Sequence, residues 1–172
     1  PVVFTGASYP ASDPGSDGPH NVLDAIRVAM AAQAKGQGVL VCFAGEIHAA
    51  RDVAKLHKFS PTPFSSLTQG PLGTVDAQGV TFYRPATNRV TMPYPSLPVP
   101  RVEVIKAVMD SDDLFLRASL GAGARGIVLE GFPGGGGVPP TWLPALRDAL
   151  AQGVSVVLTP RSPFGRIVPL AA

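Results

Sequence analysis

Short apolar runs alternate with segments of helical periodicity along this chain. The runs at residues 2–5 and 39–43 are β-branched and apolar, which is typical of buried strands. Between them a helix is predicted to start near Asp17 and to end at about Lys35. Its apolar positions, spaced by three and four residues, predict one buried face formed by Val22, Leu23, Ile26, Ala29 and Met30.

The middle of the chain lacks the alternation of strands and helices. Residues 61–90 are polar and rich in turn-forming residues, and the segment Asp76–Gly79 precedes the alternating run Val80–Tyr83, so we expect a small antiparallel hairpin there. Residues 92–100 contain four prolines. This density excludes a helix or a central strand and predicts an extended connector at a domain boundary.

A second pattern of alternating strands and helices follows the connector, and the alternation predicts an α/β fold class. The expected strands are residues 102–105, 126–129 and 154–158, and the expected helices are residues 111–120 and 140–151.

Composition excludes several classes of protein. Hydrophobic residues make up 45% and charged residues 15% of the 172 residues, which opposes intrinsic disorder. The net charge of +2 comes without a basic cluster, so no nucleic-acid partner is expected. No apolar run reaches about 18 residues, so we expect no membrane association. The single cysteine cannot form an internal disulfide, so we expect a cytoplasmic location. Cys42 lies in an apolar run and is expected to be a buried strand residue.

The glycine-rich segment at residues 131–137 follows a predicted strand and precedes a predicted helix, where backbone N–H groups can bind a phosphate or carboxylate. Its spacing fits neither GxGxxG nor GxxxxGK[ST], which favours a plain strand-to-helix turn. His48 and His57 lie nine residues apart without an HExxH or CxxC motif, so no metal is expected. The absence of a GxSxG motif argues against a serine hydrolase.

Lys55 follows the second strand on the side where open α/β sheets bind ligands. A lysine that is partly desolvated beside Glu46 or Asp52 could relay a proton to an activated hydroxyl. The alternative is a solvated lysine paired with a surface acid.

Several segments carry a resemblance when taken together. Their sequences are Ser-Asp-Gly-Pro-His-Asn at 16–21, Ala-Arg-Asp-Val-Ala-Lys at 50–55, Gly-Pro-Leu-Gly at 70–73 and Arg-Ser-Pro-Phe-Gly at 161–165. They resemble, in order and separation, the motifs of bacterial-type L-asparaginases and glutaminase-asparaginases. The resemblance implies the second half of a flavodoxin-like parallel sheet domain at residues 1–91, the connector at 92–100, and the first part of a smaller α/β C-terminal domain at 101–172.

The resemblance also implies an activity, the hydrolysis of L-asparagine, or of glutamine, to the acid and ammonia. In this family a threonine attacks the amide carbonyl, and a second threonine, an aspartate and a lysine assist proton transfer without a metal or organic cofactor. Lys55 matches the lysine, and Ala7 matches an alanine whose backbone carbonyl faces the substrate amide. A homo-oligomer, a dimer of dimers, is implied as well.

The chain departs from the family pattern in one decisive respect. The family's TGGT and GTDT motifs, which carry its two threonines, do not occur, and Thr5 and Thr74 do not replace them. Ala54 also stands where threonine is common. We therefore expect a central fragment of a longer polypeptide that is inactive alone. Two alternatives stay open: a catalytically dead binding or oligomerisation module, and the amidase subunit of a tRNA-dependent amidotransferase.

Overall fold

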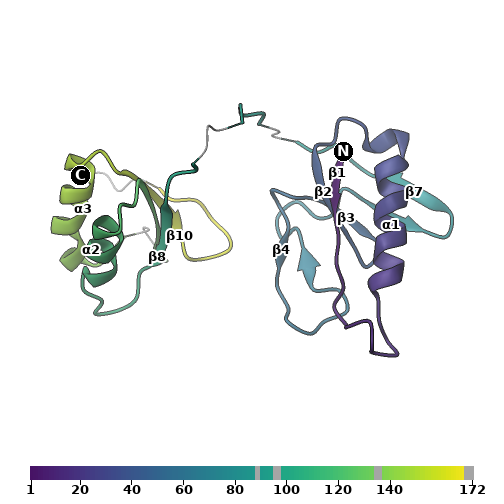
Figure 1. The fold of residues 1–172 in the computed structure, drawn as a ribbon, viewed down its shortest axis with the longest axis horizontal. Coiled ribbons are helices and arrows are strands. Elements are labelled where there is room, and N and C mark those ends of the chain that lie inside the picture. Colours follow the sequence, from purple (N-terminus) through teal and green to yellow (C-terminus); the bar gives the residue numbers. More distant parts are fainter. Residues whose placement is uncertain (88–89, 95–97, 134–136, 169–172) are drawn as a thin grey trace. The chain divides into compact units, whose positions relative to one another are not determined.

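The computed structural model of the protein describes residues 1–87, 90–94, 98–133 and 137–168. The chain divides into two compact units, Pro1–Met92 and Pro93–Ala172. Both units combine strands and helices (Figure 1), which confirms the predicted α/β class. Within the predicted connector, residues 95–97 lie outside the described residues, as do residues 134–136 of the glycine-rich segment.

The first unit is built on a mixed five-stranded sheet of order β1-β2-β3-β6-β7. The strands β1 (Val2–Phe4) and β2 (Val39–Phe43) pair in parallel, and all other neighbours pair in antiparallel fashion. β6 (Gly73–Asp76) and β7 (Gly79–Phe82) form a hairpin, which confirms the predicted one. A separate two-stranded sheet joins β4 (Ala54–Lys55) to β5 (Phe64–Ser65).

Strand β3 (Glu46–Ala49) was not predicted. It follows β2 after only two residues, Ala44 and Gly45, which both have positive φ, at 49° and 77°. A two-residue turn with positive φ at both positions matches the right-handed twist of the flanking strands. The segment after β2 therefore turns back along the sheet at once, and it reaches Lys55 only after β3 has ended.

Helix α1 (Gly18–Met30) crosses the sheet, but with a different face than the spacing predicted. Its buried residues are Asn21, Asp24, Ala25 and Val28, whereas all five residues predicted to be buried are exposed, Met30 at 81%. The helix also ends five residues before Lys35, because Ala31 adopts an extended conformation before a short 3₁₀ turn. The prediction of the buried face was wrong, because apolar residues lie on nearly every side of this helix and the side that packs on the sheet is the one with Ala25 and Val28.

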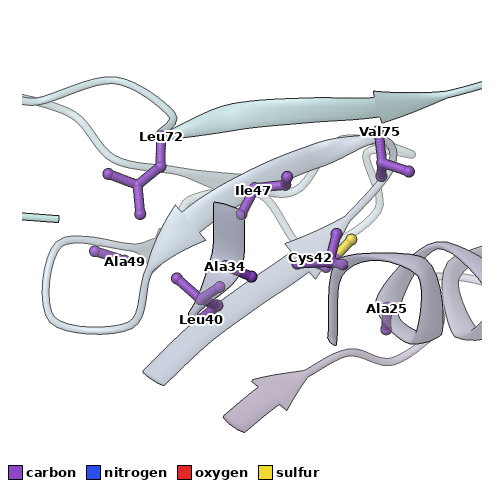
Figure 2. Packing of buried hydrophobic residues seen from close by; sticks show 9 residues of the cluster. Ala25, Ala34, Leu40, Cys42, Ile47, Ala49, Leu72 and Val75 are labelled. Carbon is purple, nitrogen blue, oxygen red and sulfur yellow. The ribbon is translucent and has the colours of Figure 1, made fainter. Parts of the chain in front are cut away.

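The core of the first unit lies between α1 and the sheet (Figure 2). Val28 from the helix and Leu40, Cys42 and Ile47 from β2 and β3 are fully buried, with Leu72 just before β6. The position of Cys42 confirms the predicted buried strand residue. This packing fixes the helix and the loop that precedes it against the strands.

The second unit contains a parallel three-stranded sheet of order β10-β9-β8. Its strands are β8 (Val102–Lys106), β9 (Gly126–Gly131) and β10 (Ser155–Pro160), and its helices are α2 (Leu114–Gly121) and α3 (Leu143–Ala151), the latter preceded by a 3₁₀ turn at Pro140–Trp142. The core includes Leu116, Ile127 and Trp142. Every predicted element of this unit is confirmed to within a few residues.

Candidate active site

Three segments of the first unit meet at the carboxyl ends of the parallel strands β1 and β2. They are the turn Gly6–Tyr9 after β1, the end of β2 at Phe43, and the small sheet of β4 and β5. Ligand sites of open α/β sheets lie at this edge.

The turn Gly6–Tyr9 is held by the carboxylate of Asp17, the residue before α1. The backbone N–H of Ser8 donates to both carboxylate oxygens at 2.9 and 3.0 Å, and that of Tyr9 donates to Oδ1 at 3.0 Å. Burial alone would raise the pKa of Asp17, but these bonds and those from its own N–H and from Asn21 outweigh burial and lower the pKa. The carboxylate is therefore ionised at neutral pH and fixes the turn.

Asn21 ties the same turn to the sheet. Its side-chain nitrogen donates to the carbonyl oxygen of Gly6 and to Asp17 Oδ2, both at 3.0 Å. Its side-chain oxygen accepts the N–H of Ala44 at 3.1 Å. Asn21 is 1% exposed, so these bonds are shielded from water and leaving any of them unmade would be costly.

The turn also contacts the loop between β4 and β5. Ser8 Oγ donates to the carbonyl of Ser60 at 3.2 Å, and the Tyr9 hydroxyl donates to the carbonyl of Phe59 at 3.4 Å. The sheet of β4 and β5 itself packs on the end of β2, where the rings of Phe64 and Phe43 lie 5.0 Å apart. The turn Gly6–Tyr9, the end of β2 and the sheet of β4 and β5 thus form one contiguous region of the first unit.

Lys55 lies in β4 with an exposed side chain, and its Nζ is 5.7 Å from the ring centroid of Phe64. The two carboxylates considered from the sequence are engaged elsewhere: Glu46 lies 3.2 Å from His48 Nε2, and Asp52 lies 3.7 Å from Arg51 Nε. In the described part of the chain no carboxylate pairs with Lys55, so neither the buried pair nor the surface pair expected from the sequence is formed.

Ala7 lies exposed at the centre of the turn Gly6–Tyr9. Its neighbours are all bonded, since the Gly6 carbonyl and the N–H groups of Ser8 and Tyr9 each have a partner. Within the described ranges the carbonyl of Ala7 accepts no hydrogen bond. The geometry leaves this carbonyl available to a ligand.

His48 is a buried titratable residue of β3 for which the sequence motifs indicate no role. Its Nδ1 lies 3.0 Å from Ser66 Oγ, and its side chain is 1% exposed. Burial lowers the pKa of His48, and the nearby Glu46 only partly offsets this effect. A neutral imidazole bonded to Ser66 therefore joins β3 to the segment after β5.

A cavity of about 660 Å³ opens at the other end of β2. Its lining mixes apolar residues such as Val39 and Met92 with polar residues such as Gln37 and Thr87 and with the cation Arg51. It contains neither Lys55 nor Ala7. Over the described ranges, no three His, Cys, Asp or Glu residues are placed to hold a metal ion, and no helix is long and apolar enough to cross a membrane.

Comparison with known families covers both units. Residues 1–88 match the family model described as asparaginase, N-terminal, and residues 101–171 match the glutaminase/asparaginase C-terminal domain. The chain belongs to the asparaginase family. The resemblance inferred from the sequence motifs is thereby confirmed.

Individual relatives give the same picture. The chain is 35% identical to an L-asparaginase of Bacillus licheniformis over 167 residues, covering 97% of this chain and 51% of that protein. It is 32% identical to a glutaminase-asparaginase of Pseudomonas fluorescens biotype A, over 91% of this chain and 44% of that protein. The asparaginase-family chain therefore spans about half the length of these curated relatives.

A solved structure shows the same fold. The probable cytoplasmic L-asparaginase from Campylobacter jejuni superposes with a TM-score of 0.89 at 29% identity, covering 98% of this chain and 53% of that one. This match supports the flavodoxin-like domain and the smaller α/β domain expected from the resemblance.

Proposed function

We propose that this chain supplies one side of the active site of an amidohydrolase that converts L-asparagine and water to L-aspartate and ammonia. The proposal rests on one observation: Lys55 and the unbonded carbonyl of Ala7 lie on segments that contact one another. Family membership across both units supports the same reaction.

In this proposal each of the two residues has a distinct role. The Ala7 carbonyl accepts an N–H of the substrate amide and orients it for attack at the amide carbon. Lys55 takes part in moving the proton from the attacking threonine hydroxyl, and the proton finally leaves with ammonia. Its exposed side chain has no carboxylate partner within the described residues, so we propose that its acidic partner comes from outside this chain.

The chain alone is proposed to be inactive, because neither a TGGT nor a GTDT motif occurs in it. Without the nucleophile, most of an enzyme's rate acceleration is lost. We further propose a cytoplasmic homo-oligomer, in keeping with the probable cytoplasmic neighbour from Campylobacter jejuni. A Haemophilus influenzae relative is named as a probable periplasmic L-asparaginase, so fractionation of the native cells is the test of location.

The test of the function is ammonia release from L-asparagine and L-glutamine, measured with the pure chain and with the chain mixed with a polypeptide that carries the TGGT and GTDT motifs. We expect no release by either polypeptide alone and release by the mixture. Release by the pure chain would contradict the proposed inactivity. A mixture that forms a stable complex without activity would instead favour the binding-module alternative.

One relative favours a second candidate function. The chain is 30% identical to a glutamyl-tRNA(Gln) amidotransferase component of Methanosarcina mazei, over 97% of this chain and 41% of that protein. An amidase component of this kind would release ammonia for transfer to a tRNA-bound acceptor. Ammonia release that depends on added tRNA and a second polypeptide would favour this candidate over the free amidohydrolase.

A further inference from the structure

We infer that Asp17 and Asn21 are positioning residues for the substrate amide, because together they fix the backbone turn that presents the Ala7 carbonyl. This inference rests on the proposed function, since it assigns a task to the same carbonyl. It adds two residues that do not themselves touch the substrate.

Asp17 occupies the residue before a helix, where an aspartate usually accepts hydrogen bonds from the first N–H groups of that helix. Here its side chain makes no such capping bond. Both carboxylate oxygens are instead directed at the turn, where they accept the N–H groups of Ser8 and Tyr9. The side chain of Asp17 therefore does not cap α1 but holds the turn.

Asn21 fixes the other side of the turn. Its amide nitrogen is bonded to the Gly6 carbonyl, directly before Ala7, and to Asp17, while its oxygen is bonded to Ala44 at the end of β2. The peptide groups on both sides of Ala7 are therefore tied to the sheet and to the start of α1. The Ala7 carbonyl is left as the unbonded acceptor between them, and its direction is set before a ligand arrives.

A charged acceptor suits this role. Hydrogen bonds between a carboxylate and backbone N–H groups are shorter and stronger than bonds between neutral groups. An asparagine at position 17 keeps the shape but offers one acceptor oxygen without charge. The substitution Asp17→Asn therefore loosens the turn while leaving the helix and the core in place.

The matched control is Asp13→Asn in the same loop. Asp13 Oδ1 accepts the N–H of Gly15 at 2.7 Å, and none of the hydrogen bonds that hold the turn Gly6–Tyr9 involves its side chain. It is exposed and belongs to neither the proposed catalytic nor the proposed binding groups. Should Asp17→Asn fail to fold, Asp17→Ser serves as the second variant, because serine is among the residues preferred at helix starts.

The activity test compares two substrates in the mixture with the threonine-bearing polypeptide. L-Asparagine offers an amide N–H to the Ala7 carbonyl, whereas the β-methyl ester of L-aspartate has none. For Asp17→Asn we expect kcat/KM for asparagine to fall on the order of 10-fold relative to the ester. Asp13→Asn should change neither substrate by more than about twofold.

A second readout uses the chain by itself. Hydrogen exchange at the amides of Ser8 and Tyr9 should become at least about 10-fold faster in Asp17→Asn and stay unchanged in Asp13→Asn. Unchanged exchange in Asp17→Asn would overturn the inference, as would equal losses for the amide and the ester substrate, which a merely structural role predicts. Equal losses leave the proposed function standing. Failure of the wild-type mixture to hydrolyse asparagine overturns the proposed function and this inference with it.

Discussion

The amino group of Lys55 lies 5.7 Å from the ring centroid of Phe64, whose ring in turn lies 5.0 Å from that of Phe43 at the end of β2. The lysine is thus connected to the carboxyl edge of the sheet through two aromatic rings and not through an ion pair. A cation over an aromatic face at an exposed site contributes about 0.5–1 kcal/mol. The contact restricts the position of the lysine side chain.

The aromatic contact gives a first prediction. Phe64→Leu keeps an apolar side chain on Phe43 but removes the ring face under Lys55, so we expect the kcat of the mixture to fall about 3- to 10-fold. The control is Phe59→Leu, because the Phe59 ring lies 5.1 Å from Lys58 in the same loop. Steady-state ammonia release measures both, and equal effects of the two substitutions would contradict the role of the Phe64 ring.

The buried His48 predicts how stability depends on pH. Its pKa is lowered in the folded state, chiefly by burial, so the unfolded chain takes up a proton at higher pH than the folded chain does. Stability is therefore full above the unfolded value of about 6.5 and falls as the pH drops below it. Urea unfolding from pH 8 to pH 5 should show this decline.

His48→Gln should remove this part of the decline while keeping a polar side chain near Ser66. An exposed histidine, His57, provides the comparison through His57→Gln. A wild-type slope that survives unchanged in His48→Gln would show that another group is responsible.

Cys42 is predicted to resist thiol reagents in the folded chain. Burial, with a smaller effect of the Asp24 carboxylate, raises the pKa of Cys42 to about 12. At a given pH its thiolate is then roughly 1,000-fold rarer than that of an ordinary cysteine. Modification by a disulfide reagent at pH 8 should be very slow in buffer and complete within minutes in denaturant; rapid reaction of the native protein would place the thiol at the surface.

At Gly73, the last glycine of the Gly-Pro-Leu-Gly segment, the neighbouring strand leaves no room for a side chain. A Cβ there would collide with the carbonyl oxygen of Thr81 and the Cα of Phe82 on the paired strand β7. Gly73→Ala should therefore lower the free energy of unfolding by about 1–3 kcal/mol. Gly121→Ala, where a Cβ meets open space, is the control and should be neutral or stabilising. A neutral Gly73→Ala in denaturant titrations would refute the collision.

The sequence predicted the second unit well because its strands are short apolar runs with clear turns between them. It missed β3 because the deciding feature is the positive φ of Ala44, and alanine rarely adopts this conformation. It chose the wrong face of α1 because apolar residues surround that helix on nearly every side, from Val22 to Met30. The hydrogen bonds of Asn21 to Gly6 and Ala44 join residues far apart in the sequence, and no periodicity reveals them.

At the site, the spacing after β2 indicated Lys55 as a candidate but did not place it correctly, because β3 intervenes and Lys55 lies in β4. It could not show that Glu46 pairs with His48, because that contact depends on the unpredicted strand β3. The sequence pattern also did not indicate the roles of Asp17 and Asn21. A Ser-Asp-Gly-Pro-His-Asn segment indicates a helix start, but only the folded turn shows that the carboxylate points away from the helix.

The most direct test of the central claim compares Lys55→Met with Lys58→Met in the mixture that supplies the threonine motifs. Lys58 is an exposed lysine three residues away and lies over the ring of Phe59 in the same way. Loss of a proton-transfer group costs about 100- to 10,000-fold in rate, so we expect the kcat for asparagine to fall at least about 100-fold in Lys55→Met and less than about twofold in Lys58→Met. Full asparaginase activity in Lys55→Met would contradict the account.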